Sequence, residues 1–354
     1  MTKIEKLIKD NIITSGSISL EEYMTMCLYH PEYGYYSKKN IIGKSGDFTT
    51  APEISQVFGE LIANWLIYNA PVFFQNKLNY LELGPGKGTL CRDILRTINI
   101  MNNGLNSKIE KVYFLEKSKE LKLYQKLISK AELISDINQI KNQTTFIIAN
   151  EFFDALPVNQ YIKIGKNWHE RRVVINQNNN LDFSINNKPV TIKLPFPKTN
   201  NEGTVFEYSR YTHLLLLDIY KLINNFGGVF LIIDYAQDNY VSTSTLSAIY
   251  KHKHVNAFFL PGQTDLSTKP NYSFFNTLAK ENNCKVIGPF SQGYFLKELG
   301  IEQRIAQLIK CNPSSKDLLL SQKKRLIDKN YMGDIFKVLI ITNNNIKDLV
   351  FENE

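Results

Sequence analysis

The chain has 354 residues, of which 43% are hydrophobic, and its formal net charge is +8 at pH 7. This length allows two domains or one elaborated α/β domain with a sizeable core. The longest apolar runs, such as Val229 to Ile233, are too short to span a bilayer, and no stretch has the pattern of a signal peptide, so we expect an intracellular protein without a membrane span. The positive charge is spread along the chain, which gives nucleic-acid binding only weak support.

The cysteines and histidines do not form a metal-binding pattern. The four cysteines are scattered without CxxC pairs, and no His/Cys cluster has zinc spacing. We therefore expect a reducing compartment and no metal. His252 and His254 alternate with lysines in a KHKH patch, which is more typical of a solvated basic loop than of a metal site.

Residues 1 to about 30 predict two helices, the second beginning at Ser19 with acids in its first turn. The next segment, residues 30–60, is rich in Gly, Pro and Tyr, and its aromatic content argues against disorder. Tyr35, Asp47 and Thr49 of this segment could close over a cofactor as a lid that excludes water. Packing of the tyrosines in a core or interface is an equal alternative. A helix start is predicted at Thr50, followed by an apolar stripe that leads to the first strand.

From Leu78 onward, buried strands alternate with helices, which predicts a doubly wound α/β sheet of seven strands. The expected strands are Tyr80–Leu83, Lys111–Leu115, a short strand near Leu133, Thr145–Ala149, Gly228–Ile233, Cys284–Pro289 and Phe336–Thr342. Two insertions interrupt this order: residues 161–205, which indicate antiparallel hairpins, and residues 237–272, which indicate a loop or helical segment. The predicted organisation is an N-terminal region of helices and lid-like loop over residues 1–60 and a main domain over residues 61–354.

The stretch LNYLELGPGKGTLC, residues 78–91, predicts a strand, a tight Gly-rich turn and a helix start. Such a turn lies at the carboxyl end of a central strand, where an open sheet binds its cofactor. A dinucleotide fingerprint needs a glycine at the position of Thr89, and the spacing of a phosphate-binding P-loop is absent around Lys87. A turn without any ligand is the remaining alternative.

The acid and the three glycines of this stretch, Glu82, Gly84, Gly86 and Gly88, resemble the first motif of class I S-adenosylmethionine (SAM) methyltransferases. They are the first candidates for cofactor binding. Two further acids are candidates because they follow the second and third strands: Glu116 for the ribose hydroxyls and Asp136 for the adenine amino group. A helix cap at Glu116 and a turn residue at Asp136 are the alternatives.

The sequence NEFFDALPV follows the fourth strand, at the edge of the sheet that faces the reactive end of a cofactor. Its acids, Glu151 and Asp154, are the candidate catalytic residues. Methyl transfer by in-line displacement depends mostly on the position of the acceptor. If the acceptor is a guanidinium, paired carboxylates can bind its planar fork and stabilise its positive charge. An N-cap at Asp154 is the structural alternative, and Asp234, Tyr235 and Glu207 are edge candidates of lower rank.

Five stretches in order, IGKSGDFTTAPEISQVFGE, YLELGPGKGTL, ANEFFDALPV, GPFSQGYFLKELGI and MGDIFKVL, resemble the MidA-like family. This family includes the mitochondrial complex I assembly factor that methylates arginine in a respiratory-chain subunit. The resemblance runs from about His30 to Ile340. It implies a class I methyltransferase fold, SAM as cofactor with S-adenosylhomocysteine (SAH) as product, and protein arginine as acceptor. By position it supports Glu82, the three glycines and Glu116 for SAM, and Glu151 and Asp154 beside the acceptor.

One segment departs from the family pattern. Where the family usually reads DLTAHVDF, this chain reads DLSTKPNY at residues 265–272, so that Lys269 and Asn271 replace a His and an Asp. A role of this segment in substrate choice does not carry over by resemblance.

The sequence thus predicts a SAM-dependent methyltransferase that acts on an arginine side chain of a protein, with a respiratory complex I subunit as the type of target. The alternatives are an assembly chaperone with structural SAM and a methyltransferase of a small molecule. Nucleic acid ranks last because the fourth strand lacks an Asn-Pro-Pro-Tyr edge. Without a clear transit peptide the chain resembles a bacterial member, for which we expect the cytoplasm; a eukaryotic member would lie in the mitochondrial matrix.

Overall fold

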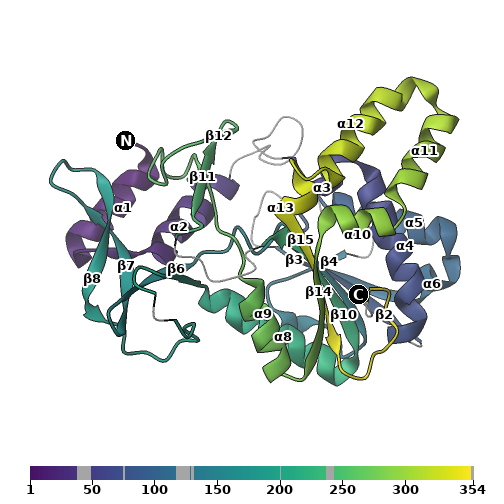
Figure 1. Cartoon of the computed structure of the whole chain (residues 1–354), viewed down its shortest axis with the longest axis horizontal. Coiled ribbons are helices and arrows are strands. Elements are labelled where there is room, and N and C mark those ends of the chain that lie inside the picture. The colour runs from purple at the N-terminus through teal and green to yellow at the C-terminus, as the bar shows by residue number, and fades with distance from the viewer. Residues whose placement is uncertain are drawn as a thin grey trace. The chain divides into compact units, whose positions relative to one another are not determined.

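The computed structural model describes residues 1–37, 49–74, 76–116, 128, 131–199, 201–236 and 243–351 (Figure 1). The chain divides into two compact units. The first unit comprises Met1–Ile41, Phe153–Leu214 and Gln237–Ser273, and the second unit comprises Ile42–Phe152, Leu215–Ala236 and Phe274–Glu354. The division into residues 1–60 and 61–354 stays a prediction.

The second unit is built on the seven-stranded sheet that the sequence predicts. From edge to edge the strands are β14 (Cys284–Ser291), β15 (Phe336–Asn343), β10 (Gly228–Tyr235), β5 (Thr145–Asn150), β2 (Leu78–Leu83), β3 (Ile109–Leu115) and β4 (Ala131–Ile134). The strands from β10 to β4 are parallel, and β15 runs antiparallel to both of its neighbours. All seven predicted strands are confirmed, so the carboxyl ends of β2, β5 and β10 lie side by side at one edge.

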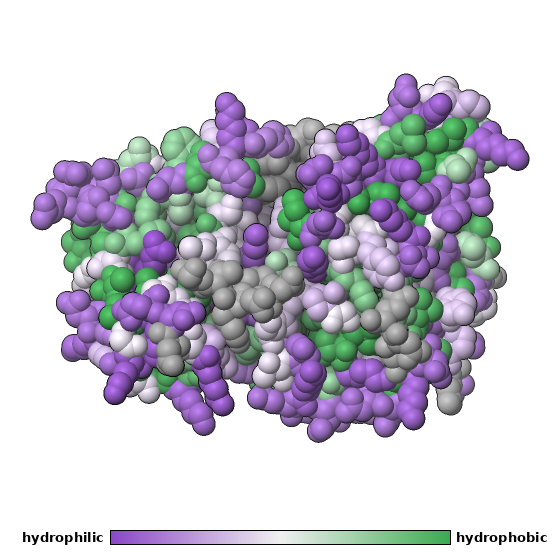
Figure 2. All heavy atoms as spheres, in the orientation of Figure 1, coloured by the Kyte–Doolittle hydropathy of each residue, from purple (hydrophilic) through white to green (hydrophobic). Residues whose placement is uncertain are grey.

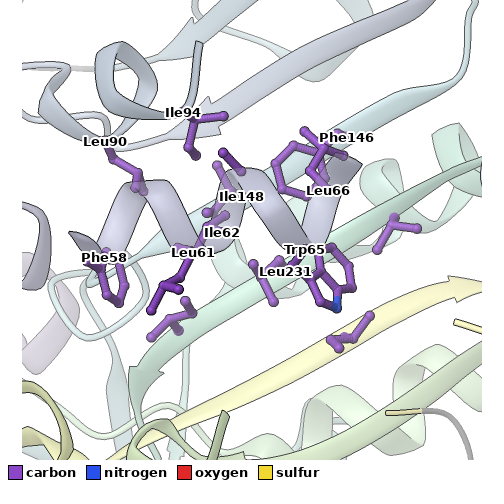
Figure 3. Close-up of a cluster of buried hydrophobic side chains, with 14 of the residues drawn as sticks. Phe58, Leu61, Ile62, Trp65, Leu66, Leu90, Ile94, Phe146, Ile148 and Leu231 are labelled. Carbon is purple, nitrogen blue, oxygen red and sulfur yellow. The ribbon is translucent and has the colours of Figure 1, made fainter. Parts of the chain in front are cut away.

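The central strands β2, β5 and β10 are buried along almost their whole length and are mostly apolar, because helices cover both faces of the sheet. Helix α4 (Gln56–Phe73) lies across one face, with α5 (Thr89–Met101) beside it (Figure 3). Figure 3 shows the side chains that meet there: Phe58, Leu61, Ile62, Trp65 and Leu66 of α4, Leu90 and Ile94 of α5, Phe146 and Ile148 of β5, and Leu231 of β10. The apolar stripe that the sequence predicts along α4 is therefore the core contact of this unit.

The helix start predicted at Thr50 is confirmed, but the helix is interrupted after one turn. Thr50 is the N-cap of α3 (Ala51–Ile54). Ser55 then adopts an extended conformation, with φ −156° and ψ 134°, and its hydroxyl accepts a hydrogen bond from Val57 N at 3.4 Å to begin α4. The short helix α3 consequently stands as a separate element at the carboxyl edge of the sheet.

The first unit contains the two predicted N-terminal helices, α1 (Lys3–Ser15) and α2 (Leu20–Tyr29). Ser19 caps α2 in a capping box with Glu22. Antiparallel strands form a sheet in the order β1 (Ile18–Ser19), β7 (Asn167–Ile175), β6 (Asn159–Ile164) and β9 (Val205–Tyr208), with β8 (Leu181–Pro189) paired to β7. Tyr161, Trp168 and Phe206 make a small core on this sheet.

A second sheet of the first unit corrects the expectation for residues 237–272. Their described part holds β11 (Ser247–Tyr250), β12 (Lys253–His254) and β13 (Asp265–Ser267), and residues 243–271 contain no helix. Ala248 and Leu266 are both buried and lie opposite each other in the antiparallel pair. The helical alternative is wrong for these residues because a buried cross-strand pair, and not a helical apolar stripe, organises them.

The other described helices are α6 (Asn103–Lys108), α8 (Arg210–Phe226), α9 (Tyr272–Glu281), α10 (Gln292–Glu298), α11 (Ile301–Cys311), α12 (Lys316–Ile327) and α13 (Met332–Ile335), with the 3-10 turns η1 (Tyr35–Ser37), η2 (Ile137–Gln139) and η3 (Pro313–Ser315). Polar residues cover much of the visible face, with apolar patches between them (Figure 2). None of the helices in the described ranges is long and apolar enough to cross a membrane.

Candidate functional site

The Gly-rich turn between β2 and α5 has a backbone that only glycine adopts readily. Gly84, Gly86 and Gly88 have φ angles of 62°, 54° and 74°. A Cβ atom at Gly84 would lie 2.7 Å from Cδ2 of Phe152, and one at Gly88 would meet the side chain of Ile128. Side chains on this turn would therefore be strained and would also displace their neighbours. Gly84 and Gly88 are thus required by their backbone conformation and by the close packing of Phe152 and Ile128, and cofactor binding at this turn stays a prediction.

Glu82 is a buried acid at the end of β2. Its side chain is 3% exposed, and Oε2 accepts a hydrogen bond of 2.7 Å from the Tyr80 hydroxyl. Burial raises the pKa of Glu82 to about 8, although the Tyr80 hydrogen bond acts in the opposite direction. The carboxyl group is therefore largely protonated at neutral pH. A cation beside it would favour the ionised form, so the site suits a positively charged ligand.

A pocket opens at the carboxyl ends of β2 and β5, within the second unit. Its wall is made by the α3 segment, the Gly-rich turn, the start of α5 and the end of β5, through Thr50, Pro52, Glu53, Glu82, Gly84, Pro85, Gly86, Lys87, Thr89, Leu90, Asn150 and Glu151. The parallel pairing of Leu83 with Ala149 brings the ends of these two strands together. Four predicted site residues, Glu82, Gly84, Gly86 and Glu151, thus share one pocket, and Gly88 is the N-cap of α5 beside it.

Glu151 lines the pocket from a left-handed backbone conformation, with φ 53°. Its backbone N–H donates to Ile233 O at 2.9 Å. Its Oε1 accepts from Ala51 N at 3.0 Å and from Asn150 Nδ2 at 3.2 Å. The carboxylate therefore binds the first turn of α3 while it forms part of the pocket wall.

Helix α3 is also held by its own acid. Glu53 accepts a short hydrogen bond from the hydroxyl of Thr89, in the first turn of α5. Together with the Glu151–Ala51 contact, this bond fixes α3 between β5 and α5. The sequence analysis does not identify Glu53, Thr89 and Asn150 as site residues. For Glu53, its position as an acid within the unusual GDFTTAPEIS stretch is a signal that could have indicated it.

The remaining second-unit candidates differ in position. Glu116 is half-buried and follows Leu115, whose carbonyl accepts from Gly84 N at 3.0 Å, so it lies next to the Gly-rich turn. Asp136 is the N-cap of η2 and accepts from Asn138 N at 2.7 Å, which matches the turn-residue alternative, and it does not line the pocket. Thr49 precedes the pocket residue Thr50, and Asp47 lies outside the described residues. The cofactor roles of Glu116 and Asp136 stay predictions.

Tyr35 and Asp154 belong to the first unit. Tyr35 is buried, and its ring packs edge-on against Tyr36 at 5.3 Å between centroids. Burial raises the pKa of Asp154 to about 7, and its backbone carbonyl accepts from Thr268 N at 2.8 Å. The Tyr36 hydroxyl donates to Oδ1 of Asp265 at 3.5 Å. The segment that departs from the family pattern, residues 265–272, therefore contacts Asp154.

The lower-ranked Glu207 is half-buried in the first unit and accepts hydrogen bonds from Gln160 and Thr245. These contacts give it a structural role between β9 and the segment before β11. Within the described ranges, no group of three or more His, Cys, Asp or Glu residues could hold a metal ion.

Comparisons with known proteins bear on the family and the fold of the chain. The model of a family described as putative S-adenosyl-L-methionine-dependent methyltransferases matches residues 60–290. Protein arginine methyltransferase NDUFAF7, mitochondrial, of Danio rerio is 29% identical, covering 96% of this chain and 87% of that protein. The homologue of that enzyme in Caenorhabditis elegans is 30% identical, covering 94% of this chain and 84% of its own length.

A crystal structure of a likely methyl transferase from Burkholderia thailandensis, bound to SAH, is similar with a TM-score of 0.82. It is 22% identical and covers 98% of this chain and 92% of that one. At this identity the likeness shows the fold, and it confirms the predicted class I methyltransferase architecture.

Proposed function

This chain belongs to the MidA-like family of SAM-dependent methyltransferases, and from this premise we propose that it methylates an arginine side chain of a protein. Its cofactor is SAM and its product is SAH. The proposal of arginine is supported by the names of the relatives, which are protein arginine methyltransferases.

The observation that carries the proposal is the buried Glu82 beside three glycines of positive φ, in one pocket with Glu151. These residues fit SAM, because the turn offers a close backbone approach and Glu82 favours a cation. SAM supplies a methyl group on a positively charged sulfur. Glu82, Gly84 and Gly86 would hold the cofactor, and Glu116 is proposed for its ribose hydroxyls.

The acceptor roles of Glu151 and Asp154 are part of the proposal. The carboxylate of Glu151 would bind and orient the guanidinium, since a charge-assisted pair with a carboxylate fixes its plane. The guanidinium nitrogen must lose a proton as it gains the methyl group. Asp154 is suited to accept this proton, because burial raises its pKa to about 7 and leaves it partly ionised at neutral pH.

The type of target and the location are proposed as well. We infer a respiratory complex I subunit as the type of substrate from the resemblance to the MidA-like family, which includes a complex I assembly factor; the relatives' names support a protein arginine as acceptor and a mitochondrial setting for those relatives. The chain would act in the cytoplasm of a bacterium or in the mitochondrial matrix of a eukaryote.

Labelled SAM added to a cell lysate with and without the chain, followed by peptide mass spectrometry, tests the proposal. We expect a labelled arginine in a protein only when the chain is present. A label confined to small molecules would support a small-molecule enzyme, and SAH binding without any label would support an assembly chaperone. Either result would overturn the proposal.

A substitution in the pocket separates binding from transfer. Glu151→Gln removes the charge but keeps an oxygen that can accept from Ala51 N. We expect SAH affinity within about twofold of the unchanged chain and a loss of arginine labelling of at least about a hundredfold. Glu132→Gln, at an exposed acid of β4, is the matched control and should change neither quantity. Unchanged labelling by Glu151→Gln would remove Glu151 from the acceptor site.

The pH dependence tests Asp154. Its pKa of about 7 lies above the ordinary value of 3.8, so the carboxyl is mostly protonated near pH 6 and mostly ionised near pH 8. If the ionised form accepts the proton, kcat/KM for a labelled peptide should rise with pH through about 7. The Asp154→Asn variant should be slower and should lack this rise. A rise that persists in the variant would assign it to another group.

A further inference from the structure

A buried acid outside the pocket wall, Asp234, accepts a hydrogen bond from the turn that carries Glu151. Asp234 lies near the end of β10 and is 0% exposed. Its Oδ2 accepts from Phe152 N at 3.1 Å, and its Oδ1 accepts from Tyr235 N at 2.8 Å. Because Ile233 of β10 pairs with Asn150 of β5, this carboxylate lies directly beside the turn that follows β5.

The turn that Asp234 contacts is in an unfavourable backbone conformation. Glu151 has φ 53°, a region that residues with a Cβ atom rarely adopt. Two hydrogen bonds from successive backbone N–H groups hold it there: Glu151 N to Ile233 O at 2.9 Å and Phe152 N to Asp234. Both acceptors belong to β10, so the last residues of this strand determine the shape of the turn.

The conformation of this turn fixes the positions of two side chains at the pocket, those of Glu151 and Phe152. It directs the Glu151 carboxylate to Ala51 N at the start of α3. It also places the Phe152 ring so close to Gly84 that a Cβ atom there would lie 2.7 Å from the ring. A displaced Phe152 N–H would therefore move the Gly-rich turn, the pocket wall and α3 together.

We propose that Asp234 is a positioning residue for the cofactor site: its carboxylate holds the Asn150–Phe152 turn so that Phe152 supports the Gly-rich turn and Glu151 faces the pocket. The inference rests on the proposed function only in treating this pocket as the SAM site. It requires no particular acceptor. A carboxylate that merely completed the hydrogen bonding of β10 would stabilise the fold without affecting the pocket.

The first experiment compares two substitutions on the same strand pair. Asp234→Asn keeps the shape of the side chain, but its amide cannot accept from both Phe152 N and Tyr235 N. Thr342→Val removes the 2.8 Å bond to Gly228 O at the opposite end of β10. We expect Asp234→Asn to weaken SAH binding by about tenfold or more in calorimetry, and Thr342→Val to leave SAH affinity within about twofold. Equal SAH affinities for the two variants would overturn the proposal.

A double-mutant cycle asks whether Asp234 acts through the turn. Glu151→Gly and Glu151→Ala both remove the carboxylate, but only glycine adopts a positive φ without strain. If Asp234 acts by holding that conformation, Asp234→Asn should weaken SAH binding several-fold more in the Glu151→Ala background than in the Glu151→Gly background. An equal loss in both backgrounds would contradict the proposal.

The same cycle keeps the test valid if Asp234→Asn alone does not fold. The Glu151→Gly background removes the backbone strain, and the double variant in that background should fold and bind SAH nearly as well as Glu151→Gly does. A double variant that folds but has lost SAH binding would refute a role through the turn. Because every readout is SAH affinity, these results are independent of whether arginine is the acceptor.

Discussion

The amino ends and the carboxyl ends of the parallel strands β2, β5 and β10, called here the amino edge and the carboxyl edge, differ in the polar groups that gather there. The hollow at the amino edge of β2, β5 and β10 is larger than the pocket at the carboxyl edge. Its described wall contains amides, threonine and aromatic residues, and its charged member, Lys77, pairs with Glu110 at 3.2 Å. The carboxyl edge instead brings together Glu82, Glu151 and Asp234.

At the amino edge, neutral polar side chains donate hydrogen bonds to backbone carbonyl groups. The Thr144 hydroxyl donates to Phe226 O at 2.8 Å, and Asn343 Nδ2 donates to Ile223 O at 3.3 Å. At the carboxyl edge, the carboxylates of Glu151 and Asp234 instead accept hydrogen bonds from backbone N–H groups, those of Ala51 and Phe152. Converging buried acids, and not the size of a hollow, therefore distinguish the edge at which we propose the cofactor site.

The largest expected effect on SAH affinity is that of a methyl group added at the carboxyl edge, compared with one added at the amino edge. Gly84 and Gly227 both have positive φ, 62° and 78°, so alanine at either should cost about 1–2 kcal/mol of stability. The new Cβ would lie 2.7 Å from the Phe152 ring at Gly84 but 3.5 Å from Thr144 Oγ1 at Gly227. We expect Gly84→Ala to weaken SAH binding by at least about a hundredfold and Gly227→Ala to leave it unchanged in calorimetry. Similar losses in both variants would remove the distinction between the edges.

The second effect is a pH dependence of stability above about pH 5, which the carboxyl edge should show and the amino edge should not. The folded-state pKa of Glu82, about 8, lies above the ordinary value of 4.5, so the folded chain keeps a proton that the unfolded chain loses. The contribution of Glu82 to the free energy of unfolding of the SAH-free protein should be fully present below about pH 4.5. It should fall by about 1.4 kcal/mol per pH unit as the pH rises toward 8. Glu82→Gln should lack this fall in urea unfolding.

Glu110 provides the matched control at the amino edge. Its hydrogen bonds with Lys77 and Lys141 lower its pKa, so its contribution is present above the ordinary pKa and is lost as pH falls through the lowered value. The difference in unfolding free energy between Glu110→Gln and the unchanged chain should therefore stay constant between about pH 5 and pH 7. Parallel stability curves for Glu82→Gln and the unchanged chain would contradict the burial argument for Glu82.

The sequence predicts the sheet well because its central strands are short, mostly apolar runs between loops. β2, β5 and β10 are buried on both faces, and the Gly-rich turn after β2 has a spacing that few ligands use. The prediction failed where the signal was weak: residues 243–271 have short polar runs, and their strands depend on the pairing of Ala248 with Leu266. Local pattern cannot show such a pairing.

The sequence also identifies acids at the ends of strands, but not their partners. Glu151 binds Ala51 N across 100 residues of chain, and Asp234 binds Phe152 N across 82. Both contacts depend on which strands are neighbours and on the φ of Glu151. These are properties of the folded sheet, so the sequence predicts Glu151 only as an acceptor residue and Asp234 only as a lower-ranked candidate.

The smallest expected effect compares one hydroxyl at each edge. Thr144→Val removes the bond to Phe226 O, and Thr89→Val removes the bond to Glu53; valine keeps the branched shape at both positions. Each loss should cost about 1 kcal/mol in urea unfolding, because a net hydrogen bond contributes about that much. SAH affinity should be unchanged for Thr144→Val and several-fold weaker for Thr89→Val, since the Thr89–Glu53 bond helps to hold α3 in the pocket wall, whereas Thr144 and Phe226 do not line this pocket. If Thr144→Val weakens SAH binding as much, the amino edge also shapes the site and the two edges cannot be separated.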